Sequence, residues 1–154
     1  MKLHFALASP FARKVRVSAI ELNLEEKIEL VPTQVAPGKS NVEYAGRFNP
    51  LRRIPALTVS RGATLVDRVV ICEYLDHMAG ESNLFPKAST RRWDVLTDHA
   101  LANGMTELAV MLRYETALRP EEKRWDVWIA DHWEKIHNGL AVFEKKAPAP
   151  SDEA

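Results

Sequence analysis

Ser9 and the segment NPLRRIPAL at 49–57 are the parts of this 154-residue sequence whose residue types and spacing could support chemistry. Ser9 stands directly before Pro10, a pair typical of a helix start. Its hydroxyl could donate a hydrogen bond to a ligand or only cap the helix, and the residues alone favour the cap. A cis Ile54–Pro55 bond would make a sharp turn that presents the backbone of Ile54 to a ligand. A trans proline would only remove an N–H from the strand that follows.

Arginines gather locally in a chain without net charge. Lys+Arg 21 balances Asp+Glu 21, so no overall field favours nucleic acid or an anionic membrane surface. Between 47 and 68, however, several arginines face one acid, Asp67, and they are Arg47, Arg52, Arg53, Arg61 and Arg68. The cluster favours an anionic ligand, although any one of these arginines is more simply a solvated surface residue.

Other sequence motifs that would indicate a binding or catalytic site are incomplete in this chain. The segment PGKS at 37–40 lacks the first glycine of a phosphate-binding loop. His132 and His137 do not share a helix face, so a zinc pair is not expected. The single cysteine, Cys72, excludes an internal disulfide, favours a reducing cytoplasmic compartment and is expected to be an inert core residue. No apolar run approaches the length of a membrane span.

The elements that must position these residues follow a βαβ–ββα order. Strands are predicted at 2–7, 28–32, 55–60 and 64–66, the first two of them parallel and the last two forming a hairpin. The first helix follows Ser9, ends at Asn23 and carries the apolar residues Val15, Val17, Ile20 and Leu22. After a polar segment at 35–48, Asp67 caps a second helix to about Met78, which buries Val70, Ile71, Tyr74 and Leu75. One four-stranded mixed sheet with helices on its faces satisfies this order.

The remainder of the chain reads as helical. A linker is predicted at 80–88, then one helix over 89–117, a break at Arg119–Pro120, and a second helix from about 120 to 145. The apolar positions of that second helix are Trp125, Trp128, Ile129, Trp133, Ile136, Leu140 and Phe143. The predicted domains are therefore 1–79 and 89–146, followed by a tail at 147–154 whose composition predicts disorder.

This layout and three local segments resemble the bacterial-type cytosolic glutathione S-transferases. SPFARKVRV at 9–17 resembles that family's active-site turn and first helix, and NPLRRIPAL resembles its cis-proline segment. LVDRVVICEYLD at 65–76 is similar to its glutathione-anchoring helix. The resemblance implies an α/β thioredoxin-like N-terminal domain (βαβ–ββα) followed by a partial all-α domain. Because that helical domain is shorter than in the family, we expect a partner surface or a dimer to cover the apolar face of 125–143.

The resemblance also implies a reaction and its site. Glutathione would be the co-substrate, no metal would be needed, and the second substrate would be a small apolar electrophile. Ser9 would stabilise the thiolate at the helix start. The implied glutathione-binding residues are Phe11, Arg13, Lys39, Arg52, Ile54, Pro55, Asp67 and Arg68. A second-substrate pocket would be formed by Trp93, Met105 and Tyr114, which at helical spacing could equally be core.

Arg68 is the main departure, because the family pattern has a Ser there. Its guanidinium could bind the γ-glutamyl carboxylate, fill the pocket or pair with Asp67. Two functions stay open as a result. The first is a cytoplasmic, homodimeric glutathione transferase of detoxification. The second is a catalytically weak or inactive binding or scaffold dimer with the same fold. A glutaredoxin-like reductase would need a cysteine near residue 9, and the sequence has none there.

Overall fold

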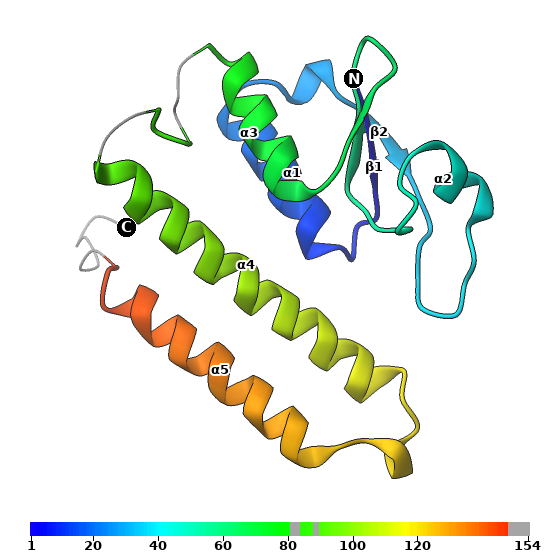
Figure 1. Ribbon diagram of the computed structural model, residues 1–154, viewed down its shortest axis with the longest axis vertical. Helices are drawn as coiled ribbons and strands as arrows, with labels where there is room; N and C mark the ends of the chain where they lie inside the picture. The colour runs from blue at the N-terminus through cyan, green and yellow to red at the C-terminus, as the bar shows by residue number, and fades with distance from the viewer. Residues whose placement is uncertain (81–83, 88–89, 148–154) are drawn as a thin grey trace, which may run out of the picture. The chain divides into compact units, whose positions relative to one another are not determined.

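The structure is a computed structural model that describes residues 1–80, 84–87 and 90–147 (Figure 1). The chain divides into two compact units, Met1–Arg92 and Trp93–Ala154. Apart from Ala147, the predicted disordered tail lies outside the described residues, and so do 81–83 and 88 of the predicted linker.

The first unit is built on a four-stranded mixed sheet with the strand order β2–β1–β3–β4. β1 (Lys2–Phe5) pairs in parallel with β2 (Glu29–Pro32) and antiparallel with β3 (Ala56–Thr58). β3 pairs antiparallel with β4 (Thr64–Leu65). The predicted mixed sheet is therefore confirmed, with its parallel first pair and its antiparallel last pair, and all four strands are shorter than expected.

Two helices cover one face of this sheet and a short one lies beyond its other face (Figure 1). α1 (Pro10–Glu21) packs against α3 (Arg68–Met78), and α2 (Val42–Arg47) follows the loop after β2. A 3-10 turn, η1 (Glu25–Lys27), connects α1 to β2. The most completely buried side chains lie between the sheet and the α1–α3 pair, and they are Leu3, Val15, Leu57, Ile71, Cys72 and Leu75.

The buried stripe of α1 differs from the predicted one. Val17 and Ile20, two of the four apolar residues that approximate a stripe on this helix, are 47% and 52% exposed. The buried positions are Ala12, Val15, Ala19 and Leu22. Their spacing of three, four and three follows the helical repeat, whereas residues two apart point to different sides of a helix.

The buried face of α3 also needs correction. Val70 is 47% exposed and Tyr74 is only half-buried, whereas Arg68, Cys72 and Asp76 are buried together with Ile71 and Leu75. Asp76 is tolerated in the core because its carboxylate accepts the N–H groups of Leu84 (2.9 Å) and Phe85 (3.1 Å). The helix therefore buries a face that includes polar side chains, which an apolar pattern does not show.

The second unit is helical, as predicted, but its second helix begins later. α4 spans Thr90–Ala117, η2 is a 3-10 turn at Glu121–Lys123, and α5 spans Asp126–Glu144. The expected start near 120 was wrong because Pro120 and Arg124, with ψ of 140° and 149°, are extended and interrupt the helix. α4 and α5 approach closely at Gly139, where an added Cβ would overlap the Sδ of Met105. Within the described residues, no helix has both the length and the apolar character that a membrane span requires.

Candidate functional site

Ser9 lies in the turn between β1 and α1. Its N–H donates to the C=O of Ala6 (3.0 Å), and its Oγ accepts the N–H of Ala12 (3.2 Å). The predicted N-cap is therefore confirmed. A hydroxyl that accepts a bond keeps its own hydrogen, and the Oγ hydrogen of Ser9 has no acceptor among the described residues. The cap and a donor role are consequently compatible.

The backbone that leads into β3 is held by two buried side chains, Tyr44 and Asn49. Tyr44 Oη and Asn49 Nδ2 each donate to the C=O of Arg53 at 2.8 Å. Asn49 Oδ1 also accepts the N–H of Leu51 at 3.0 Å. Burial raises the pKa of Tyr44 to about 12, so its hydroxyl keeps the hydrogen that it donates. Sequence reasoning missed both residues, although Asn before Pro is a known start of a turn in which Asn bonds the backbone two residues on.

Ile54 lies in the segment 49–57, where the sequence indicated a turn that presents its backbone to a ligand. The Ile54–Pro55 bond is cis, as predicted. The buried side chain of Ile54 belongs to a cluster against which Ala6 also packs, and Ala6 is the residue whose C=O binds Ser9. Neither the N–H nor the C=O of Ile54 has a hydrogen-bond partner among the described residues. A backbone donor and acceptor thus lie available near the start of α1.

Asp67 and Arg68 lie where α3 begins. Asp67 Oδ1 accepts the N–H of Val69 at 2.8 Å, which confirms Asp67 as the N-cap, and the Val66–Asp67 bond is also cis. Oδ2 of the same carboxylate forms an ion pair with Arg68 Nη1, and the Arg68 side chain is only 10% exposed. The guanidinium carbon lies 4.5 Å from the centre of the Phe11 ring. Of the three roles left open for Arg68, the pairing with Asp67 is therefore present.

Lys14 on α1 is a further charged residue near this cluster, and sequence reasoning did not single it out. Burial, the largest effect on Lys14, lowers the pKa of its ammonium below the usual value. Cys72 is 1% exposed, as expected of a core residue, and its Sγ lies 3.4 Å from Ser18 Oγ. Burial raises the pKa of the Cys72 thiol, which disfavours the reactive thiolate.

The other predicted glutathione contacts of the first unit lie at its surface. Arg13, Lys39 and Arg52 are exposed. Arg52 Nη1 donates to Ser40 Oγ at 3.4 Å, so this guanidinium lies close to the residue that follows Lys39. Arg52 also has a positive φ of 52°, which few side chains adopt, and its N–H donates to Asn49 C=O at 2.8 Å. Over residues 1–80, 84–87 and 90–147, the structure thus links Arg52 to the neighbour of Lys39 and shows no such link for Arg13.

The three residues predicted for a second-substrate pocket lie on α4, in the second unit. Trp93 and Tyr114 are 69% and 43% exposed. Met105 is half-buried and packs against Gly139 of α5. Their assignment to a substrate pocket stays a prediction.

Comparison with known proteins finds the same family that the three sequence segments resemble. The family described as "Glutathione S-transferase, N-terminal domain" matches residues 8–78. A protein of Escherichia coli K12, described as "Uncharacterized GST-like protein YibF", is 28% identical over 145 residues. That alignment covers 94% of this chain and 68% of YibF.

Solved structures agree over nearly the whole chain. A glutathione transferase family member from Pseudomonas fluorescens Pf-5, solved with bound glutathione, is 38% identical with a TM-score of 0.89, over 95% of this chain and 71% of its own. A glutathione S-transferase from Methylobacillus flagellatus KT, with glutathione bound, is 34% identical with a TM-score of 0.78, over 94% and 68% of the two chains. On this sequence identity and this shared fold, the chain belongs to the glutathione transferase family.

Proposed function

We propose that this chain binds glutathione along the backbone of Ile54 and activates its thiol with Ser9. The observation that carries this proposal is the N–H and C=O of Ile54, which have no hydrogen-bond partner in the described part of the chain and lie near the start of α1. An extended peptide binds by pairing its main chain with such a donor and acceptor, and the cysteinyl unit of glutathione has both groups. The bound glutathione in the Pseudomonas and Methylobacillus relatives supports this choice of ligand.

Ser9 is proposed to favour the ionised sulfur. A thiol with a pKa of about 8.5 is mostly protonated at neutral pH. The Ser9 hydrogen and the positive N-terminal end of α1 both stabilise a thiolate placed there, so its pKa falls. The thiolate then forms a carbon–sulfur bond with a small apolar electrophile, and the leaving group or a conjugated acceptor of the electrophile takes the displaced electron pair. Trp93, Met105 and Tyr114 are proposed to contact that electrophile.

The charged ends of glutathione are proposed to meet the charged residues of the first unit. The Arg68 guanidinium, held against Phe11 and Asp67, would bind the γ-glutamyl carboxylate. Asp67 would bind the adjacent ammonium. Lys39 or Arg52 would bind the glycyl carboxylate.

We further propose a cytoplasmic homodimer that acts in detoxification. A single cysteine, which is buried, fits a reducing compartment. Exposed apolar side chains on and next to α5 support association with a second copy, and they include Trp125, Val127, Trp133 and Leu140.

Ser9→Ala tests the enzymatic proposal. We expect the wild-type chain to be retained on immobilised glutathione and to conjugate chlorodinitrobenzene, and Ser9→Ala to lower kcat about a hundredfold. Loss of the N-cap would also cost about 1 kcal/mol of stability. Ser9→Asp separates the two effects because it caps the helix but donates no hydrogen bond, so it should be stable and inactive. Ser9→Thr should keep both the cap and the activity. Full activity of Ser9→Asp would contradict the role of Ser9.

A second candidate function is an inactive binding or scaffold protein, and the buried guanidinium of Arg68 favours it. Arg68→Ser distinguishes the two. If Arg68 binds the γ-glutamyl carboxylate, Arg68→Ser weakens glutathione binding about tenfold, the value of one charge-assisted hydrogen bond. If the guanidinium instead blocks the site, the wild-type chain is not retained on glutathione and Arg68→Ser is. Thermal melting of both proteins checks that the variant is folded.

A further inference from the structure

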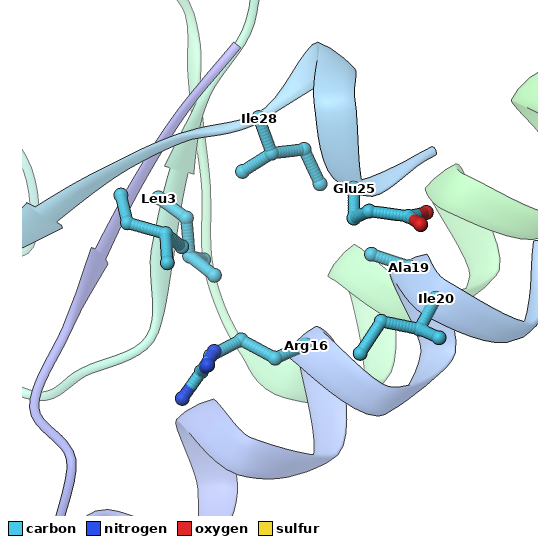
Figure 2. Close-up of a pocket in the computed structure, with 7 residues that line it drawn as sticks. Leu3, Arg16, Ala19, Ile20, Glu25 and Ile28 are labelled. Atoms are coloured by element: carbon cyan, nitrogen blue, oxygen red, sulfur yellow. The ribbon is translucent and has the colours of Figure 1, made fainter. Parts of the chain in front are cut away.

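A cavity beside the C-terminal half of α1 has no part in the proposed glutathione site. Its volume is about 370 Å³, within the range of pockets that bind small molecules. Five apolar residues from β1, α1, β2 and the segment before β2 line it (Figure 2), and they are Leu3, Ala19, Ile20, Ile28 and Leu30. Ile20 and Leu30 are 52% and 42% exposed, so the cavity opens to solvent between the end of α1 and the edge strand β2.

This cavity is remote from Ser9. Ala19 lies ten residues after Ser9 along the same helix, and at 1.5 Å per residue this separates the two by roughly 15 Å. Ser9 stands at the N-terminal end of α1, whereas Ala19 and Ile20 lie in its last turn. A molecule in the cavity would therefore leave the backbone of Ile54 accessible.

Two charged side chains border the apolar walls, and Figure 2 shows them on different sides of the cavity. The Arg16 guanidinium carbon lies 5.5 Å from the centre of the Phe5 ring. No carboxylate forms an ion pair with Arg16 within the described part of the chain. Glu25 is exposed, while Arg16 is half-buried. Water therefore screens the attraction between Arg16 and an anion less than the attraction between Glu25 and a cation. The charges that border the cavity favour an anionic ligand.

We propose that this cavity binds a small amphipathic carboxylate. The apolar body lies between the last turn of α1 and β2, and the carboxylate accepts hydrogen bonds from the Arg16 guanidinium, whose fork suits two carboxylate oxygens. Apolar walls with one placed polar group are the usual composition of a small-molecule site. The site is independent of glutathione binding and of any turnover.

The test compares decanoate with decanol on the full chain, by calorimetry and by amide chemical shifts. We expect decanoate to bind at least tenfold tighter than decanol, and to shift the amides of Ile20 and Leu30. Arg16→Gln should abolish this preference. Glu25→Gln is the matched control at the other side of the cavity, and it should keep or increase the preference. Ile20→Ser, at an exposed position, should weaken both ligands alike.

Three results would overturn the proposal. The first is equal binding of decanoate and decanol by the wild-type chain. The second is an Arg16→Gln variant that keeps the tenfold preference. The third is competition between decanoate and glutathione, which would place decanoate in the candidate site near Ser9. Failure of the chain to bind immobilised glutathione would refute the proposed function and leave this one intact, because the two experiments share no ligand.

Discussion

At the scale of single residues, Ser9 and Arg68 each combine a structural and a proposed chemical role through different atoms. A lone pair of Ser9 Oγ caps α1, which leaves its hydrogen for a ligand. Arg68 pairs with Asp67 through Nη1, while its guanidinium carbon lies 4.5 Å from the centre of the Phe11 ring. Evidence that a residue is structural therefore does not exclude a part for it in binding.

His4 is a third residue whose surroundings determine its chemistry. Its side chain is 6% exposed, its Nδ1 lies 2.9 Å from Thr33 Oγ1, and its ring centre lies 4.0 Å from that of Phe48. Its Nε2 is buried, without a hydrogen-bond partner among the described residues. Burial, and secondarily the charge of Lys2, lower the pKa of His4 below the usual 6.5. The folded chain therefore favours the neutral imidazole more strongly than the unfolded chain does.

We predict that His4 makes the fold less stable in acid. As the pH is lowered through about 6.5, the unfolded chain binds a proton at residue 4 and the folded chain does not yet bind one. The free energy of unfolding therefore decreases with decreasing pH, until the pH drops below the lowered pKa of His4 in the folded chain. His4→Phe should reduce this fall, because the variant has no imidazole at residue 4. Urea unfolding at about pH 7.5 and about pH 5.5 measures it. An unchanged pH dependence in His4→Phe would contradict the prediction.

At the scale of elements, α2 and the turn after it act together on the strand that follows. Tyr44 from α2 and Asn49 from the turn both bind the C=O of Arg53, one residue before Ile54. The backbone offered at Ile54 is thus held in part by α2, which contributes no proposed ligand contact of its own. This explains why a short polar segment of the sequence carries two buried polar side chains.

We predict that Asn49→Ala destabilises the fold by about 1–3 kcal/mol, because it removes one of the two hydrogen bonds to the Arg53 C=O and the hydrogen bond that the Leu51 N–H donates. Glutathione binding should weaken as well, since Ile54 loses its support. Tyr44→Phe removes only one of the two bonds to Arg53 and should have a smaller effect. Asn49→Asp is the matched control: it keeps the acceptor for Leu51 but loses the donor to Arg53. Chemical unfolding and retention on immobilised glutathione measure these effects. An Asn49→Ala variant with the stability and the glutathione binding of the wild type would disprove the supporting role of Asn49.

At the scale of the whole molecule, the two compact units differ in how much apolar surface they hide. The first unit encloses a core between its sheet and the α1–α3 pair. On α5, Ile136 is buried, whereas Trp133 and Leu140 are 50% and 52% exposed. Fully burying a large apolar side chain is worth about 1.5–3 kcal/mol, so a surface that covers these two residues would be favoured.

We predict that the chain sediments as a homodimer and that Leu140→Asp shifts it toward monomer. The carboxylate would be costly to bury in an interface but is tolerated on an exposed helix face. Sedimentation velocity of both proteins, with a hydrophobic dye as a second measurement, provides the test. A wild-type monomer that does not bind the dye would contradict the prediction.

The sequence by itself determined the local features. The caps at Ser9 and Asp67 and the cis bond at Ile54–Pro55 were all predicted, and the structure confirms them. The fold family followed from the same segments. These features depend on residues within a few positions of one another, so a short stretch of sequence is enough to specify them.

Only the tertiary structure decided which faces are buried and which polar groups meet. Val17 and Val70 are apolar yet exposed, the Arg68 guanidinium lies over Phe11, and Arg53 is bound by two side chains that no motif marked. The cavity beside Arg16 likewise forms from β1, α1 and β2 together. These outcomes depend on contacts between segments far apart in the chain, whose energies are settled only when the elements pack.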